Sequence, residues 1–534
     1  MFHLHRLTSK VVLACCLTIG LTACPGPVPP PSPSALTVEQ WALTEATPGA
    51  AFIAEMSRAP QGTFQAELTD VDGERTPLTV DVQGTALQLR VPVTASGGFQ
   101  QLRLTGEGQT FEQTVTVLGS RGFVDDTRVL ALVQAETART TFEAALAAQG
   151  LALASGGWRE LDGDAGPCAD RLAVVGTGGA GVGETLARLR ALPGVRVADA
   201  EGLFKVDPAS LWDRGLINVR FYYKRAIGNG DTTGSGVTVA VLDTGIRADD
   251  PEFPASEDPA DPRRVLPGRN FVNVSAAPND DFRFSFFGHG NSVAQMIAGL
   301  QRGVASGSEV LPVKVCDESG VCRTSHIVQG LCYAMSAAAP GRTVLNLSFG
   351  ADVPSEIMRR ALVAATDADT LIAAAVGNEA AGQSESRTVS KQHFPASYDL
   401  PGVLVVGALE SVDPPFDVSD GNGGSEDLFA DVSGWKRATT SRKAAALDVV
   451  APGVIRFTDD TVQVPNGTSF ATPLAAGALA QWREACPTAS PTALVIQIKA
   501  DAVLTNIREA DRNATSVGTG LLQLRASATR CPEI

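Results

Sequence analysis

The sequence predicts several folded units, the largest of which is a three-layer α/β/α domain with a mostly parallel sheet. Two observations predict this layering. Short runs of Val, Leu and Ala recur between helical stretches from residue 207 onwards, and they are apolar throughout instead of alternating with polar residues. Strands of this kind are covered on both faces, as in a parallel sheet between helices. The runs are GVTVAVLD, VLPVKV, VLNLS, TLIAAAV, VLVVGAL and LDVVAP.

Length and composition limit the alternatives. The chain has 534 residues, 44% of them apolar and 19% charged, which is typical of globular proteins. At roughly 100 to 200 residues per domain, this length suggests about three folded units. The net charge is -15 and Lys and Arg form no dense run. Phosphate binding depends on such basic clusters, so a nucleic-acid partner is not expected.

Residues 1–23 have the features of an export signal. Arg6 and Lys10 precede an apolar stretch over 11–21, and LTAC follows it. The apolar stretch is shorter than the ~20 residues of a membrane-spanning helix. LTAC resembles the bacterial lipobox, whose cysteine, here Cys24, is acylated and becomes the first mature residue. This implies an exported lipoprotein of the cell envelope, and the alternative is ordinary cleavage that leaves a free cysteine.

Two further segments precede the α/β units. Residues 24–34 are rich in proline and predict an extended linker. Residues 35–119 contain short alternating runs separated by Gly, Pro and Asp, a pattern that predicts a small antiparallel β-sandwich. The runs are FQAEL, PLTVDVQG, LQLRVPV and QTVTVLG. This module shows no cluster of chemical groups, so we interpret it as a spacer or adhesion module.

Residues 120–206 predict a β-α-β-β-α-β order, which is the ferredoxin-like split motif. The same segment contains GxGxxG at Gly176, Gly178 and Gly181, with Asp199 at a plausible distance for a ribose contact in a dinucleotide site. The unit lacks the longer βαβαβ order of a dinucleotide domain. We therefore interpret the glycines as a turn between a strand and a helix.

Histidine is the most common general base near neutral pH, and the chain has five. Two of them lie in the signal segment. His289 lies in FFGHGNSVAQMIAG, between two glycines and at the predicted start of a helix, and we expect it to face a cleft. His326 lies inside the predicted helix TSHIVQGLCYA, where we expect a structural or a surface residue. His289 is therefore the candidate base.

A nucleophile and a third polar group complete the candidate site. Ser469 in NGTSFATP begins an Ala-rich helix, where the helix dipole and free N–H groups favour developing negative charge. Asp243 ends the buried strand GVTVAVLD, and a buried carboxylate needs a partner. Pairing with His289 would fix the tautomer of the imidazole. The DTG at Asp243 is also the aspartic-peptidase signature, but that chemistry needs a second carboxylate motif, and none is present.

One amide is placed to assist this chemistry. Asn378 follows the predicted strand in LIAAAVGNEA. Its side-chain N–H₂ and the backbone N–H of Ser469 are the candidate oxyanion hole.

The motifs VLDTGI, HGNSVAQ, VGNE and NGTSFATP, in this order, resemble the subtilase family of serine peptidases over residues 207–534. The resemblance implies cleavage of protein substrates through an acyl-enzyme, without a cofactor for the chemistry. It also implies that residues 120–206 are a propeptide, which assists folding, inhibits the enzyme and is removed by self-cleavage, so that the enzyme could reach the medium. Ser348, Phe349 and Gly350 in VLNLSFG then resemble the strand that pairs with substrate.

The sequence departs from the family pattern in several places. The usual HGTH is HGNS, with Asn291 and Ser292, which we expect to be tolerated. SEDPADPRR and DPPFDVSDGNGGSED suggest inserted loops. Asp280 and Asp281 are candidate ligands for a structural Ca²⁺, but no EF-hand spacing is present, so we assign no metal site and interpret both as solvated loop charges. We place His393 near the base of the specificity pocket.

Six cysteines remain after the signal and Cys24 are set aside, and export permits disulfides between them. We expect Cys316 to pair with Cys322 and Cys486 with Cys531; the sequence does not fix the pairing. A different function also remains open at this point. The sandwich and the lipid anchor would suit a surface adhesion or binding lipoprotein whose triad is vestigial, although every catalytic residue type is present.

Overall fold

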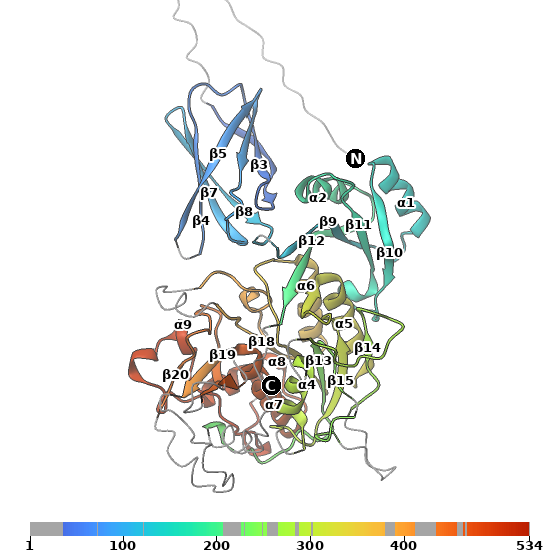
Figure 1. Cartoon of the computed structure of the whole chain (residues 1–534), viewed down its shortest axis with the longest axis vertical. Coiled ribbons are helices and arrows are strands. Elements are labelled where there is room, and N and C mark those ends of the chain that lie inside the picture. The colour runs from blue at the N-terminus through green and yellow to red at the C-terminus, as the bar shows by residue number, and fades with distance from the viewer. Residues whose placement is uncertain are drawn as a thin grey trace, which may run out of the picture.

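The computed structural model describes most of the chain from residue 36 to residue 532 (Figure 1). The predicted signal, Cys24, the proline-rich linker and both inserted loops lie outside the described residues. The described ranges are 36–71, 73–120, 122–206, 226–228, 230–247, 249–253, 265–283, 288–300, 303–379, 390–411, 434–456, 463–464 and 467–532.

The first unit, here called the sandwich, is built from eight short strands in the order β1-β3-β6-β5-β4-β7-β8-β2. Neighbouring strands are antiparallel except the pair β2 and β8. Alternate residues enter one shared apolar core, which includes Phe52, Leu68, Leu87 and Leu102. The strands are β1 (Val38–Leu43), β2 (Glu45–Ala46), β3 (Ala51–Met56), β4 (Gln65–Thr69), β5 (Arg75–Gln83), β6 (Ala86–Arg90), β7 (Gly98–Gly106) and β8 (Gln109–Val117).

The second unit, here called the ferredoxin-like unit, has the predicted β-α-β-β-α-β order and an antiparallel sheet in the order β10-β11-β9-β12. A short 3₁₀ helix, η1 (Gly166–Ala169), lies between β10 and β11. Gly178, at φ 60°, lies in the turn between β11 and α2, which confirms the interpretation of GxGxxG as a turn. The elements are β9 (Val124–Val133), α1 (Arg139–Ala148), β10 (Ala152–Glu160), β11 (Arg171–Gly176), α2 (Val182–Arg190) and β12 (Val195–Lys205).

The two faces of this antiparallel sheet are covered by different parts of the chain. Val129 and Ala131 of β9 pack with Phe142 of α1 and Leu186 of α2. Leu130 and Leu132, on the opposite face of β9, belong instead to the core of the third unit. The pleat of a strand sends successive side chains to opposite faces, so β9 joins two apolar cores. The ferredoxin-like unit is therefore packed onto the third unit through one face of its sheet.

The third unit, here called the parallel-sheet domain, confirms the predicted three-layer α/β/α fold. Its sheet has the order β14-β15-β13-β17-β18-β19-β21-β22, with β20 paired to β19. The pairs from β14 to β21 along this path are parallel, and β22 is antiparallel to β21. The strands are β13 (Thr238–Asp243), β14 (Arg269–Asn270), β15 (Glu309–Lys314), β17 (Thr343–Leu347), β18 (Leu371–Ala375), β19 (Val403–Ser411), β20 (Trp435–Arg437), β21 (Val449–Arg456) and β22 (Gln463–Val464).

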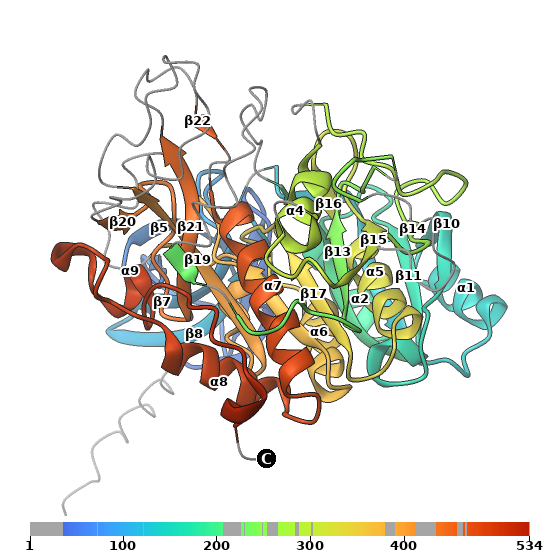
Figure 2. The same ribbon diagram turned by 90° about the horizontal axis from the view of Figure 1, so that it is seen from below.

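Helices cover both faces of the parallel sheet (Figure 2). Helices α4, α7 and α8 form one layer, in which α7 packs across β17, β18, β19 and β21. Helices α5 and α6 pack together in the other layer, against the ferredoxin-like unit. Among the described residues, no helix has the length and apolarity needed to cross a membrane. The helices are α4 (His289–Ala298), α5 (Thr324–Ala337), α6 (Glu356–Asp367), α7 (Thr468–Ala485), α8 (Pro491–Asp501) and α9 (Ala514–Val517).

Candidate active site

Asp243 and His289 meet at one edge of the parallel sheet. Asp243 is the last residue of β13, and His289 is the first residue of α4. The imidazole Nδ1 lies 2.7 Å from Asp243 Oδ1, and both side chains are fully buried. The same carboxylate oxygen accepts the backbone N–H of Thr244 at 2.7 Å. This pair can hold the imidazole in one orientation and stabilise its protonated form.

The start of α4 is fixed by the carboxylate of Asp280, a role that the sequence did not predict. Asp280 accepts the backbone N–H of Asn291 at 2.9 Å and that of Phe282 at 3.1 Å. Burial raises the pKa of Asp280, and these two hydrogen bonds oppose the rise. Asp280 is only 8% exposed, so its interpretation as a solvated loop charge is wrong. A carboxylate at a helix N-terminus is favoured by the dipole, and here it holds the turn that carries His289.

Asn291 and Ser292, where the sequence departs from the family pattern, lie in the same region. The Asn291 side chain donates to Asp250 Oδ2 at 2.7 Å, and Gln295 donates to the same oxygen at 2.7 Å. Ser292 Oγ donates to the carbonyl O of Gly288 at 2.7 Å. Both residues that depart from the family pattern are therefore fully buried and hydrogen-bonded within α4 and its surroundings.

Ser469 lies in the first turn of α7, as predicted, next to the helix that carries His289. Helices α4 and α7 pack against each other, and the ring of Phe470 lies 5.5 Å from the imidazole of His289 between centroids. Ser469 Oγ donates to the carbonyl O of Ser348 at 2.9 Å, and Ser348 Oγ donates to the carbonyl O of Ser469 at 3.0 Å. The start of α7, which carries Ser469, therefore lies beside the start of α4, which carries His289.

Asn378 lies beside the start of α7. Its side-chain Oδ1 accepts the backbone N–H of Thr468 at 3.0 Å. Gly467 precedes the helix with φ 128°, and a Cβ there would lie 2.7 Å from Asn378 Nδ2. The N–H groups of a first helical turn have no partner inside the helix. The Asn378 amide and the N–H of Ser469 therefore belong to the same small region.

The segment predicted to bind substrate is paired with the end of β12. The N–H of Gly350 donates to the carbonyl O of Lys205 at 3.1 Å, and the N–H of Lys205 donates back to Gly350 at 3.1 Å. On its other side β12 pairs with β16 (Val321–Arg323), and the N–H of Val206 donates to the carbonyl O of Gly320 at 3.0 Å. The end of β12 therefore lies between β16 and the segment that contains Gly350.

Phe349, the residue before Gly350, contributes packing. Its ring meets that of Phe204 of β12 edge-on, with centroids 6.1 Å apart. Both side chains are buried. Ser348 and Gly350 thus present backbone groups, whereas Phe349 forms part of the apolar contact beneath them.

Asp199 has a different role from the ribose contact that the glycine motif could have suggested. Its carboxylate accepts the N–H of Ile357 at 2.7 Å and the hydroxyl of Ser355 at 3.0 Å, at the start of α6. Burial raises the pKa of Asp199 to about 6, and the hydrogen bonds from Ile357 and Ser355 oppose the rise. Asp199 is an interface residue between the ferredoxin-like unit and the parallel-sheet domain.

Glu201 repeats this arrangement at the neighbouring helix. It accepts the N–H of Ser325, in the first turn of α5, at 2.9 Å. Burial raises its pKa, and the hydrogen bonds from Ser325 oppose the rise. Two acids of β12 therefore meet the positive ends of two helix dipoles.

The other two histidines stand apart from the Asp243–His289 pair. His326 lies inside α5, as expected, and burial, with Arg159 and Arg323 nearby, lowers its pKa to about 3. The ring of His393 lies against the Cα positions of Gly350 and Gly377. It is therefore next to the segment that pairs with β12.

Three disulfides join all six remaining cysteines. Cys316–Cys322 and Cys486–Cys531 confirm the expected pairs. The third, Cys168–Cys332, links η1 of the ferredoxin-like unit to α5 of the parallel-sheet domain. Among the described residues, no group of three or more His, Cys, Asp or Glu side chains is placed to hold a metal ion.

The part of the chain that contains these residues is similar to known proteins. The protein-family model described as "Subtilase family" matches residues 234–520 of this chain. Subtilisin Savinase from Lederbergia lenta is 34% identical over 267 residues, which are 48% of this chain and 80% of that protein. Subtilisin E from Bacillus subtilis (strain 168) is 31% identical over 304 residues, 55% of this chain and 66% of that protein. A cold adapted subtilisin-like serine proteinase of solved structure is 24% identical, with a TM-score of 0.41, and the match covers 56% of this chain and 91% of that chain.

Proposed function

Since the chain belongs to the subtilase family of serine endopeptidases, we propose that it hydrolyses protein substrates with Asp243, His289 and Ser469 as its catalytic triad. The buried 2.7 Å contact between His289 and Asp243, beside the helix that begins at Ser469, carries this proposal. No cofactor is needed, because the side chains supply the nucleophile and the acid and base.

The proposed reaction uses these three side chains. Ser469 Oγ attacks the substrate carbonyl carbon while His289 takes the hydroxyl proton, and the protonated imidazole then gives that proton to the leaving amine. Water repeats the sequence on the acyl-enzyme: His289 takes its proton, and Ser469 Oγ leaves and is reprotonated. Asp243 holds the ring and stabilises its positive charge throughout.

Asn378 Nδ2 and the N–H of Ser469 would stabilise the oxyanion of each tetrahedral intermediate. Their common place at the start of α7 supports this role. In subtilisin, a member of the same family, loss of such an amide costs about 10²–10³ in kcat.

The ferredoxin-like unit acts as the propeptide in this proposal. The end of β12 lies on Gly350 with both backbone hydrogen bonds made, as an extended substrate would. Self-cleavage is therefore expected beyond Val206, the residue that follows β12. Until the unit leaves, β12 blocks the segment that would bind substrate.

Export and membrane attachment complete the proposal. The signal-like residues 1–23 and the lipobox at Cys24 support an exported lipoprotein of the cell envelope. Three disulfides are consistent with an oxidising compartment.

The test replaces the nucleophile. Ser469→Ala should leave the chain uncut after folding, as judged by intact mass under reducing conditions, and should lower casein hydrolysis by about a million-fold, the scale found for the nucleophile of subtilisin. Ser490→Ala is the matched control, because Ser490 also begins a helix, where it caps α8 away from the site. Equal self-processing and turnover in both variants would defeat the proposal. Absence of hydrolysis and of processing in the unaltered chain would instead favour a binding lipoprotein with a vestigial triad.

A further inference from the structure

One covalent bond crosses from the ferredoxin-like unit to the parallel-sheet domain. Cys168 belongs to η1, Cys332 belongs to α5, and the two are 164 residues apart in sequence. Cys168 is 2% exposed and Cys332 is fully buried. The other two disulfides of the described chain both lie within the parallel-sheet domain. Among the described residues, this disulfide is the one covalent side-chain link between the two units.

The bond spans the place where self-cleavage is proposed. Cys168 precedes Val206, the end of the described ferredoxin-like unit, and Cys332 follows Ala226, where description of the chain resumes. Hydrolysis of any peptide bond between Val206 and Ala226 cuts the backbone once. The two products remain linked by the sulfur–sulfur bond.

We propose that the processed enzyme is a two-chain protein in which the ferredoxin-like unit remains a disulfide-linked partner of the peptidase. This rests on the proposed function only in that the backbone is cut by the enzyme itself. The ferredoxin-like unit occupies the face of the peptidase that α5 and α6 form.

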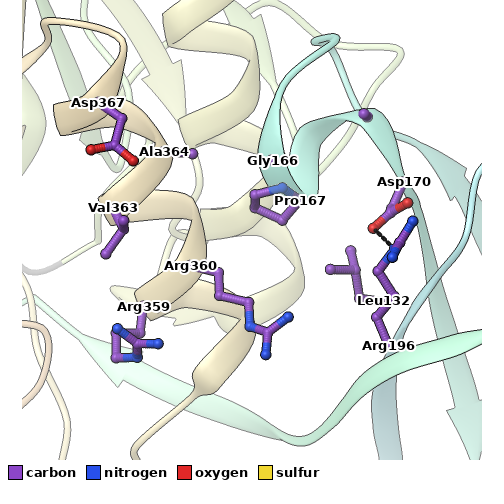
Figure 3. Close-up of a pocket in the computed structure, with 11 residues that line it drawn as sticks. Leu132, Gly166, Pro167, Asp170, Arg196, Arg359, Arg360, Val363, Ala364 and Asp367 are labelled. Atoms are coloured by element: carbon purple, nitrogen blue, oxygen red, sulfur yellow. Dashed lines mark ion pairs between the residues drawn. The ribbon is translucent and has the colours of Figure 1, made fainter.

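The ferredoxin-like unit and the peptidase pack closely at one point of this surface and leave a cavity beside it. Gly166 of η1 lies against Ala364 of α6, since a Cβ on the glycine would be 2.9 Å from the Ala364 Cβ. Next to this contact is a cavity of about 480 Å³ between η1 and α6 (Figure 3). Pro167 and Asp170 line it on one side, and Arg360 on the other. The packing of η1 against α6 therefore leaves a cavity at this place, and the adjacent disulfide holds the two units together there.

The link changes how inhibition responds to concentration. A free propeptide dissociates once the protein is diluted below the dissociation constant of the complex. A linked one rebinds at an effective concentration on the order of millimolar, whatever the dilution. The end of β12 therefore returns to Gly350 after every opening, and backbone cleavage by itself does not free the site.

The link also retains the sandwich. Asp352 of the parallel-sheet domain accepts the N–H of Gly97 at 3.2 Å and the N–H of Ser120 at 3.0 Å. The side chain of Gln392 accepts the N–H of Phe99 at 2.8 Å. With the sandwich joined to the ferredoxin-like unit by the main chain, every part N-terminal to the cut stays with the peptidase. Any attachment of the N-terminus then holds the processed enzyme as well.

The first experiment does not depend on self-cleavage. The full chain carrying Ser469→Ala receives a recognition sequence for a site-specific protease between Val206 and Ala226 and is cut there. Intact mass in denaturant without reductant should show one species, heavier than the uncut chain by one water, and reductant should separate it into two. Removing the disulfide inside the parallel-sheet domain, by Cys316→Ala with Cys322→Ala, should leave the link intact. Two separate pieces without reductant in the otherwise unaltered chain would overturn the proposal.

The second experiment tests the consequence for inhibition. Processed protein with its native cysteines is compared with the Cys168→Ala, Cys332→Ala chain, and casein hydrolysis is followed after 100-fold dilution. Activity per molecule should rise by tenfold or more in the variant and stay unchanged in the native chain. An equal rise in both would overturn the proposal. If the double variant does not fold, the native chain alone decides, because a rise in its activity on dilution contradicts a covalent partner. Loss of all hydrolysis together with a retained link would defeat the proposed function and leave the link standing.

Discussion

The catalytic corner and the seam between the ferredoxin-like unit and the parallel-sheet domain both bury carboxylates, but they use them differently. Asp243 is buried against an imidazole that can share its charge. Asp199 and Glu201 are buried against helix N-termini, and burial raises the pKa of both. The corner thus pairs its carboxylate with a side chain that can carry positive charge, whereas the seam buries acids whose charge opposes docking. We therefore expect the catalytic pair to stay formed under conditions that weaken docking of the ferredoxin-like unit.

The largest effect is expected at the corner. Asp243→Asn should lower kcat by about 10⁴-fold, because the amide no longer fixes the tautomer or stabilises the imidazolium. Docking of the ferredoxin-like unit should be unaffected. Steady-state hydrolysis of a peptide substrate measures the first effect, and Asp367→Asn, at the exposed end of α6, is the control. Full activity of the Asp243 variant would contradict the role of the pair.

The segment around Gly350 should matter in both regions, because β12 pairs with it and substrate is proposed to bind there. Gly350→Ala places a Cβ that overlaps the ring of His393, so the ring or the segment must shift, and we expect the pairing of Gly350 with β12 to be lost. Loss of two backbone hydrogen bonds, each worth about 1 kcal/mol, predicts roughly tenfold or greater weakening of both substrate kcat/KM and binding of the ferredoxin-like unit.

Gly181→Ala is the control for this change, because a Cβ at Gly181 has no neighbour within 4 Å. The same variant also checks that the GxGxxG motif is only a turn. Weakening of substrate binding without weakening of the ferredoxin-like unit would show that they do not use the same segment.

The seam should respond to pH in a defined direction. The pKa of Asp199 is raised to about 6 in the docked state, so docking is strongest below its ordinary pKa near 4 and weakens as pH rises through 6. This rise in the pKa of Asp199 corresponds to a change of about 3 kcal/mol in the free energy of docking. Glu201 acts in the same direction.

The measurement is dissociation of the ferredoxin-like unit between pH 4 and 8 in the cut Cys168→Ala, Cys332→Ala chain. Asp199→Asn should flatten the profile, and Glu184→Gln, on the exposed surface of α2, should not. Docking that strengthens as pH rises would contradict the account of the seam.

The smallest effect concerns the sandwich. Asp352→Ala removes the acceptor for the N–H groups of Gly97 and Ser120, which should weaken docking of the sandwich by about 1–3 kcal/mol. Hydrolysis by the processed enzyme should not change. Hydrogen exchange at residues 97–120 measures the loosening, and unchanged exchange would show that other contacts hold the sandwich.

Much of this architecture follows from local sequence. Buried parallel strands have a composition of their own, and GVTVAVLD and VLVVGAL became β13 and β19 as expected. The positions of Asp243 at a strand end and of His289 and Ser469 at helix starts follow from the same patterns. The pairs Cys316–Cys322 and Cys486–Cys531 join residues of one domain.

What the sequence did not predict depends on how distant segments meet. Cys168–Cys332 requires the ferredoxin-like unit to lie on α5, which no local pattern specifies. Asp280 looks like a loop charge by composition, and only its packing against the start of α4 shows otherwise. Asp199 likewise finds its partners on another unit.

Ser469 is proposed to be a nucleophile that the buried His289–Asp243 pair activates. Prolonged reaction of the full chain with a fluorophosphonate, followed by peptide mapping, measures this activation. We expect one phosphonyl group per molecule, attached to Ser469, and its loss in His289→Ala. A chain that stays unmodified, or one that is modified equally with and without the imidazole, would contradict the claim.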